Sequence, residues 1–254
     1  MDDISRQFAT GAVRGQFMEW ESVCKELEKV SFEMNTLVYR LSHDLNTPLT
    51  SVLGLVDLIE AENADVSRHY LGLIRTRIDR MRNTIRDLLY TSRLQNQLTT
   101  LEKADLNTLI QRDVLEMEEL NRTRVVVETK IVGEHPVRTD VFRLRVVLSC
   151  LLSNAVQYAD PNKPQPTVLV HAHCTPSRLI LTVKDNGIGI SAEQQPHVFE
   201  MFYRGTHASN GSGLGLFLVK KAVEQLEGVI TLRSEEGAGT MVQLTLPNHK
   251  LGTE

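Results

Sequence analysis

The spacing of apolar residues in the first hundred positions constrains the fold of this chain more than any other feature. From Trp20 to Leu41, apolar side chains recur at alternating steps of three and four residues, which is typical of a coiled-coil helix. The same alternation recurs from Leu71 to Leu88, beyond a polar turn over residues 61–67. Two helices with one apolar stripe each predict a helical hairpin, and a dimeric four-helix bundle is the simplest way to bury both stripes.

The pattern changes near residue 98, where helical spacing gives way to short runs of β-branched residues. These runs alternate with helical segments near 140–159 and 214–227, which predicts a second domain, an α/β sandwich. The expected strands are 124–132, 167–174, 179–184, 229–233 and 241–246. We therefore expect a coiled-coil helix over 1–40, a hairpin over 41–97, a linker over 98–104, an α/β domain over 105–248 and a tail over 249–254.

Composition excludes several classes of protein. The net charge of −4 and a pI near 6.1 lack the basic footprint of a nucleic-acid or membrane-surface protein. The three cysteines share no metal-ligand spacing, and no apolar run is long enough to cross a membrane. We expect a cytoplasmic protein with no nucleic-acid partner and no membrane insertion, or the cytosolic part of a membrane receptor.

His43 is the first candidate for chemistry. It follows helical spacing but lies off the apolar row, so its imidazole is expected to face solvent. Asp44 beside it could accept its proton or hold its tautomer, and an exposed neutral imidazole is a competent nucleophile. Pro48 predicts a bend just after the histidine. The competing interpretation is an ordinary surface histidine near a kink.

Two glycine clusters and one asparagine are the candidates in the second domain. Asp185 ends a strand and is followed by the turn 186–190, whereas the cluster 211–216 opens a helix, where free N–H groups favour phosphate. Asn154 lies in an otherwise apolar helix and could be a satisfied core amide or an oxygen ligand for a hard cation such as Mg²⁺. Taken singly, both clusters could be no more than turn and cap glycines.

Together, these segments resemble a known family. His-Asp-x-x-Thr-Pro, Leu-Ser-Asn-Ala-x-x-Tyr, Asp-Asn-Gly-Ile-Gly-Ile, Phe-Glu-x-Phe-Tyr-Arg-Gly and Gly-Ser-Gly-Leu-Gly-Leu occur in that order, and the chain resembles the sensor histidine kinases of two-component systems over about residues 20 to 247. The resemblance implies a dimerisation and phosphotransfer hairpin joined to an ATP-binding domain of the type also found in gyrases. It implies ATP and Mg²⁺ as cofactors, a homodimer, and an aspartate on a response regulator receiver domain as the phosphoryl acceptor.

The resemblance also implies roles for individual residues. His43 is similar to the phosphoacceptor, Asp44 to its acid/base partner, and Thr47 to the residue that positions water during dephosphorylation of the regulator. Asn154 resembles the magnesium ligand and Asp185 the adenine-reading carboxylate. The remaining residues assigned to the nucleotide site are Tyr158, Gly187, Gly189, Gly213, Leu214, Gly215 and Thr240, of which Thr240 resembles the residue that supports the adenine contact.

The chain departs from the family pattern at a few positions. Gln157 stands where many members carry a basic residue, and we expect Lys163 to compensate or nucleotide affinity to be modest. Asn46 and Cys150 also depart from common residues, and the segment 204–212 is short for an ATP lid. Two alternatives stay open: an ATPase or conformational switch of the gyrase type, and a scaffold or phosphatase-only protein, which Gln157 favours.

Periodicity predicts how a signal enters. The steps from Leu41 to Leu45 and from Leu45 to Leu49 are both four, so the helix cannot keep the supercoil of the preceding segment around His43. We expect a parallel dimer in which an upstream sensor or input domain, missing from this chain, shifts the first helix and alters access to His43.

Overall fold

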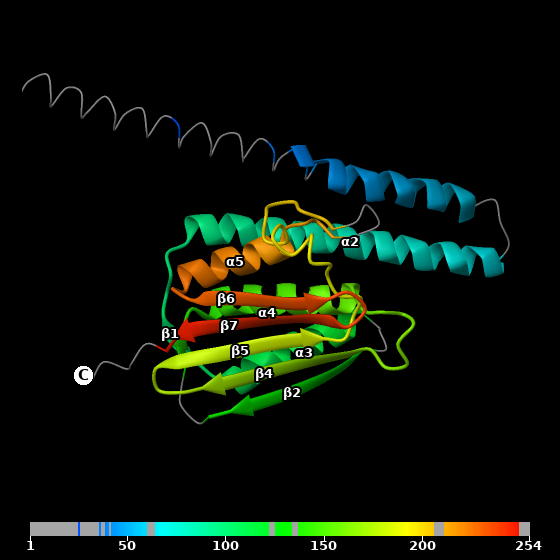
Figure 1. The fold of residues 1–254 in the computed structure, drawn as a ribbon. Coiled ribbons are helices and arrows are strands. Elements are labelled where there is room, and N and C mark those ends of the chain that lie inside the picture. The colour runs from blue at the N-terminus through cyan, green and yellow to red at the C-terminus, as the bar shows by residue number, and fades with distance from the viewer. Residues whose placement is uncertain are drawn as a thin grey trace, which may run out of the picture. The chain divides into compact units, whose positions relative to one another are not determined.

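The computed structural model describes residues 25, 36, 39–40, 42–59, 64–121, 125–133, 137–205 and 211–248 (Figure 1). The chain divides into two units, Met1–Met81 and Arg82–Glu254, and the boundary falls inside helix α2 (Ala64–Asn96). The expected coiled coil over 1–40 lies almost wholly outside the described residues, as do most of the expected lid and the tail.

The first unit is helical, as the apolar spacing predicts. Residues 42–59 form one helix, and α2 begins at Ala64 after a short connection. The helix runs through Pro48 without ending there, and the proline side chain is buried. Large apolar side chains on both helices remain exposed in the single chain: Leu49, Leu53, Val56, Leu71 and Ile78. A hairpin with uncovered apolar stripes is what the sequence predicts for one half of a bundle.

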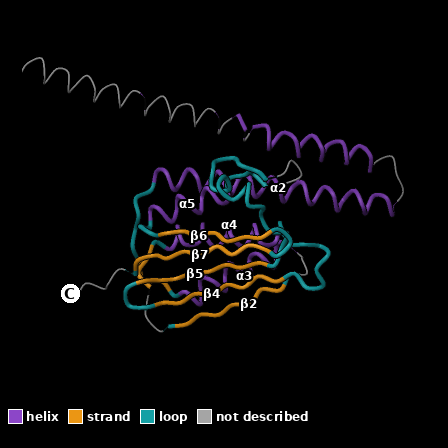
Figure 2. Tube along the Cα trace, in the orientation of Figure 1, coloured by secondary structure: helices purple, strands orange, loops and turns teal. Residues whose placement is uncertain are grey.

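The second unit is built on a five-stranded sheet in the order β2-β4-β5-β7-β6 (Figure 2). Strands β2 and β4 pair in parallel, and the other neighbours pair antiparallel. The strand bounds are β2 Val126–Val132, β4 Thr167–Cys174, β5 Arg178–Asp185, β6 Val229–Glu235 and β7 Gly239–Pro247. Each agrees with an expected strand to within two residues.

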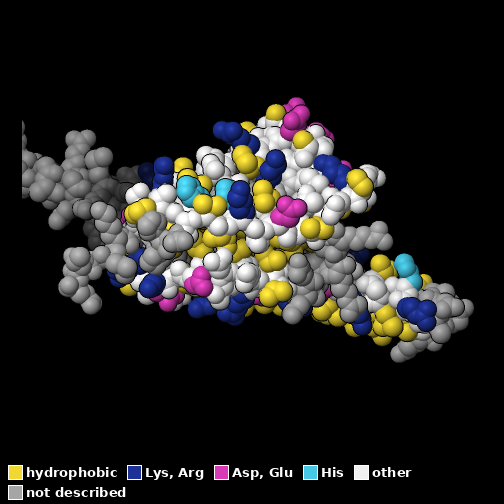
Figure 3. All heavy atoms as spheres, turned by 90° about the horizontal axis from the view of Figure 1, so that it is seen from below, with side chains coloured by type: hydrophobic (Ala, Val, Ile, Leu, Met, Phe, Trp, Pro, Cys, Tyr) yellow, Lys and Arg dark blue, Asp and Glu magenta, His cyan; other side chains and the backbone are white. Residues whose placement is uncertain are grey.

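Three helices of this unit pack with the sheet: α3 (Leu106–Asn121), α4 (Val141–Gln157) and α5 (Gly215–Gln225). Alternate residues of β4, such as Val168, Val170 and Ala172, are buried, because successive side chains of a strand point to opposite faces. From below, hydrophobic side chains form a band between two more polar layers (Figure 3). The predicted fold class, a helical hairpin followed by an α/β sandwich, is confirmed. None of the described helices is long and apolar enough to cross a membrane.

The expected linker over 98–104 ends in a short strand. Glu102–Ala104 forms strand β1, which pairs antiparallel with β3 (Val137–Thr139) as a separate two-stranded sheet. Three-residue strands are too short to show a period of two in sequence, and they gain their order from the partner strand.

Within the second unit, a buried network ties the end of α2 and the linker to α4 and α5. Arg143 on α4 is 2% exposed and donates to Asp140 Oδ2 (2.6 Å), Gln225 Oε1 (2.9 Å) and the Gln97 carbonyl (2.6 Å). Asp140 also accepts from the Arg143 amide (2.9 Å), as the N-cap of α4, and from the Thr100 amide (2.8 Å). The start of the linker is therefore tied to α4 and α5 by polar contacts removed from solvent.

The C-terminal part of α2 presents two different faces. Thr84, Asp87, Thr91 and Leu94 are buried, and Asp87 Oδ2 accepts a 2.6 Å hydrogen bond from the hydroxyl of Ser212, in the second glycine cluster. In contrast, Ile85 remains exposed on the stripe that continues from Leu71 and Ile78. At 100° per residue, the centres of the two faces are about 160° apart around the helix. The C-terminal part of α2 therefore packs within the second unit without using the apolar stripe.

Candidate active site

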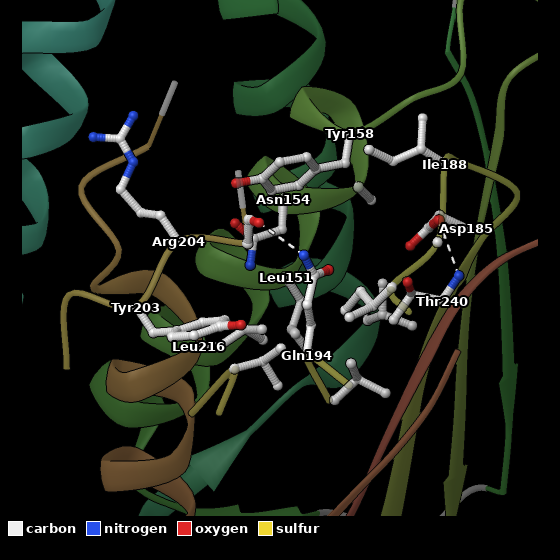
Figure 4. A pocket seen from close by; sticks show the side chains of 17 residues that line it. Leu151, Asn154, Tyr158, Asp185, Ile188, Gln194, Tyr203, Arg204, Leu216 and Thr240 are labelled. Carbon is white, nitrogen blue, oxygen red and sulfur yellow. Dashed lines mark hydrogen bonds between the residues drawn. The ribbon is translucent and has the colours of Figure 1, made fainter. Parts of the chain in front are cut away.

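A cavity of about 150 Å³ opens beside α4 and the ends of β5 and β7 (Figure 4). Its walls are mostly apolar, and a few polar side chains converge on it, which is the usual character of a small-molecule site. Of the residues expected at the nucleotide, Asn154, Tyr158, Asp185, Gly189 and Thr240 line it. The other lining residues are Leu151, Ala155, Val183, Ile188, Ile190, Gln194, Val198, Tyr203, Arg204, Gly205, Leu216 and Val242.

Asp185 ends β5 with its carboxylate at the cavity wall. Its Oδ1 accepts hydrogen bonds from the amides of Gly187 (2.8 Å) and Thr240 (3.2 Å), the second of which is drawn in Figure 4. Burial raises the pKa of this carboxyl, against the lowering effect of the two amides and of Lys163. The amides hold the carboxylate in one orientation, so that it can accept a hydrogen bond from an exocyclic amine.

The turn after Asp185 requires its glycines. A Cβ on Gly187 would lie 2.3 Å from the Tyr158 carbonyl oxygen. Gly189 has φ +71° and lies against the Glu235 carbonyl, in a conformation that side chains disfavour. The two glycines let the turn approach the end of α4 and the end of β6, which closes the cavity around Asp185.

The second glycine cluster lies at the start of α5, and of its residues Leu216 lines the cavity, whereas its glycines do not. Gly215 lies beside the Asn154 side chain, and Gly213, with φ +72°, lies against the backbone of Phe202. Leu214 is fully buried, and its amide donates to the Ser212 hydroxyl (3.2 Å), so its side chain belongs to the core. Only the backbone of Leu214 is therefore left to meet a nucleotide, and the assignment of this residue to the nucleotide site stays a prediction.

Asn154 faces the cavity from α4, next to the N-terminus of α5. In the part of the chain that the structure describes, its side-chain amide makes no hydrogen bond, and no cluster of three or more His, Cys, Asp or Glu residues could hold a metal. One free amide oxygen fits Mg²⁺, which commonly takes one or two protein ligands and completes its shell with phosphates and water. The site therefore fits a metal brought with a nucleotide and not an ion bound by the protein alone.

Sequence reasoning missed several residues of the cavity. Tyr203 and Gln194 line it, and Arg204 is an exposed cation at its edge (Figure 4). Tyr203 and Arg204 belong to the motif Phe-Glu-x-Phe-Tyr-Arg-Gly, which was recognised without roles for these residues. Their position beside the cavity was the missing information, because the segment 191–205 has no regular structure to predict.

Lys163, which we expected to compensate for Gln157, does not line the cavity. Its ammonium nitrogen lies 2.5 Å from the Asn186 carbonyl oxygen and 2.9 Å from that of Gly237. The lysine is therefore engaged by the backbone, and Arg204 is the cation that the structure places at the cavity instead. Gln157 itself is exposed and lies beside Gly211.

The predicted phosphoacceptor lies on the helix 42–59. The His43 side chain is 70% exposed, and its Nδ1 lies 3.3 Å from Asp44 Oδ1. An imidazole that donates from Nδ1 to a carboxylate carries its lone pair on Nε2, which is then free to act as a nucleophile. The Thr47 hydroxyl donates to the His43 carbonyl (2.9 Å), one turn back along the helix.

Two family models match the chain. Residues 33–97 match the His Kinase A (phospho-acceptor) domain, and residues 139–250 match the histidine kinase-, DNA gyrase B- and HSP90-like ATPase. Together the matches span more than half of the chain, in the order found in the catalytic core of sensor histidine kinases. The chain belongs to this family.

Relatives with curated descriptions carry the same core within longer sequences. The chain is 29% identical over 258 residues to the methanogenesis regulatory histidine kinase FilI of Methanothrix harundinacea, covering 95% of this chain and 29% of that protein. It is 30% identical over 252 residues to the sensor protein kinase WalK of Staphylococcus saprophyticus, covering 94% of this chain and 40% of that protein. The chain thus spans less than half the length of either relative.

Solved structures share the fold. The Acinetobacter baumannii histidine kinase AdeS matches with a TM-score of 0.61 at 21% identity, over 82% of this chain and 98% of that one. Full-length ShkA, solved in complex with AMPPNP, matches with a TM-score of 0.59 at 24% identity, over 85% of this chain and 46% of that one. At these identities the likeness concerns the fold alone.

Proposed function

We propose that this chain autophosphorylates His43 with ATP and passes the phosphoryl group to an aspartate of a response regulator receiver domain. The observation that carries the proposal is the presence, in one chain, of an exposed His43–Asp44 pair and a cavity formed around Asp185 and Asn154. An ATPase of the gyrase type would need the cavity but has no use for an exposed histidine and carboxylate on a hairpin.

In this proposal the cavity binds the adenine of ATP. Asp185, held by two amides, accepts a hydrogen bond from the exocyclic amine, and the apolar walls cover the ring. The phosphates extend toward the start of α5 and Arg204, where backbone N–H groups and a cation favour negative charge. Asn154 would hold Mg²⁺, which neutralises charge on the phosphates.

The transfer itself needs positioning more than covalent help. His43 Nε2 attacks the γ-phosphorus, the bond from that phosphorus to the bridging β–γ oxygen breaks, and ADP leaves with the electron pair. Asp44 keeps the proton on Nδ1 and stabilises the positive charge that develops on the ring. In the second step a receiver carboxylate attacks the same phosphorus, the N–P bond breaks, and the neutral imidazole returns.

The protein is proposed to act as a homodimer, and also to dephosphorylate its partner. The exposed apolar residues of the hairpin, including Leu49, Leu53 and Ile78, leave a surface that a second copy would cover in a four-helix bundle. We assign to Thr47, one turn beyond His43, the role of orienting a water molecule toward the phosphorylated regulator. We further propose that an input domain precedes the hairpin in the whole protein and that the kinase core acts in the cytoplasm.

Incubation with γ-labelled ATP tests the proposal. The wild-type chain should acquire label that survives base and is lost in acid, as a phosphoramidate does. His43→Gln should remove the label while ATP binding and dimerisation persist, because the side chain is exposed. Label on His43→Gln would refute the acceptor assignment. ATP turnover without any label would favour the gyrase-type switch, and neither label nor turnover would favour a scaffold or phosphatase-only protein.

A further inference from the structure

Lys163 lies on the loop between α4 and β4, and its ammonium group meets four backbone carbonyl oxygens. Nζ is 2.5 Å from Asn186 O, 2.9 Å from Gly237 O, and 3.4 Å from both Gly187 O and Ala238 O. A lysine that is only hydrated at the surface would not have carbonyl oxygens from two separate turns around its ammonium group.

The four carbonyls belong to the two turns that support the nucleotide cavity. Residues 186–187 follow Asp185 at the end of β5, and residues 237–238 connect β6 to β7 ahead of Thr240. The turns also touch directly, because the Gly237 amide donates to the Ile188 carbonyl (2.7 Å). The Thr240 amide, just after the second turn, is one of the two that fix Asp185.

Carbonyl oxygens aimed at one point repel each other unless a cation lies between them. The Lys163 ammonium supplies that cation, and its charge also lowers the pKa of the nearby Asp185 carboxyl, against burial. Removing the charge should let the two turns separate and change the spacing between Asp185 and the Thr240 amide.

We propose that Lys163 is a positioning residue of the nucleotide site, a tethered cation that holds the two turns together and thereby sets the adenine-reading geometry of Asp185. The proposal deepens the proposed function and rests on it for the identity of the ligand. It predicts that Lys163 acts on the adenine end of the nucleotide, and not on the phosphates as its charge alone would suggest.

The test compares Lys163→Met, which keeps the length of the side chain and loses the charge, with Lys184→Met. Lys184 is an exposed lysine on β5, immediately before Asp185, so its replacement removes the same charge close to the site without touching the carbonyls. Circular dichroism should show that both variants are folded.

The first measurement needs no nucleotide. Hydrogen exchange followed by mass spectrometry should show faster exchange in peptides covering 186–189 and 235–240 for Lys163→Met, by about tenfold or more, which corresponds to losing hydrogen bonds to a charged group. Lys184→Met should exchange like the wild type in these segments. Unchanged exchange in Lys163→Met would overturn the proposal.

The second measurement is calorimetric titration with ATP and with ADP, followed by autophosphorylation kinetics. Lys163→Met should weaken the binding of ATP and of ADP by the same factor, again about tenfold. It should also raise the KM for ATP with little change in kcat. A larger loss for ATP than for ADP would overturn the proposal in favour of a phosphate contact. A wild-type chain that fails to bind ATP would refute the proposed function instead, and the exchange measurement alone would then decide whether Lys163 holds the turns.

Discussion

Replacing Arg143 with methionine should destabilise the second unit more than a typical single substitution. The side chain is 2% exposed and loses three hydrogen bonds, to Asp140, Gln225 and the Gln97 carbonyl. Removing one partner of a buried ion pair costs about 3–5 kcal/mol, because the other charge stays buried without compensation.

The structure places this substitution near the lower end of that range. Asp140 keeps the amides of Arg143 and Thr100 as donors, so its carboxylate is only partly left without partners. We expect a loss of about 3 kcal/mol, equivalent to a fall in Tm of roughly 6–12 °C for a unit of this size.

Differential scanning calorimetry of the whole chain measures the effect, and the transition that moves with added ATP identifies the second unit. The matched variant is Arg143→Met combined with Asp140→Asn, which removes the uncompensated charge but keeps an oxygen that caps α4. The double variant should be more stable than Arg143→Met alone. A double variant less stable than the single one, or a single variant with an unchanged Tm, would refute the reasoning.

Three further outcomes are expected. Asp185→Asn should weaken the binding of ATP by about 1–3 kcal/mol and remove the preference for ATP over GTP, because a buried hydrogen-bonding group becomes mismatched. Equal ATP titration curves for the variant and the wild type would exclude the adenine-reading role of Asp185. Thr47→Ala should keep autophosphorylation and slow dephosphorylation of a regulator, whereas equal losses in both assays would contradict water positioning. Burial raises the pKa of Asp87 above 3.8, so ionisation costs wild-type stability as pH rises from that value through the raised pKa. The Tm of Asp87→Asn relative to that of the wild type should therefore rise with pH across that window and then level off. A difference in Tm that does not change with pH would contradict the raised pKa of Asp87.

The strands and helices of the second unit could be predicted because each has enough residues to show its period. The alternation in β4 and the apolar run of α4 place both within a residue or two. Strands β1 and β3 could not be predicted, since three residues carry no period and their order comes from pairing with each other.

The candidate site was predictable where a residue's type limits its chemistry, as for Asp185 and Asn154. The site was not predictable where the role of a residue depends on the direction in which its side chain points. Charge alone suggested that Lys163 would reach a phosphate, but the side chain ends among carbonyls. Likewise, Arg143 lies in an apolar helix, and apart from Asp140 three residues before it, its side-chain partners come from residues 46 and 82 positions away.

The two faces of α2 restrict how the length of this helix can vary. One inserted residue between Ile78 and Thr84 would turn the second face by about 100° relative to the first, so a chain could keep either its apolar stripe or its contact with Ser212, but not both. An insertion of seven residues would restore the phase to within about 20° and lengthen the helix by about 10 Å. Kinases that share both contacts should therefore differ in length here by numbers of residues that restore the helical phase, such as about seven, eleven or eighteen.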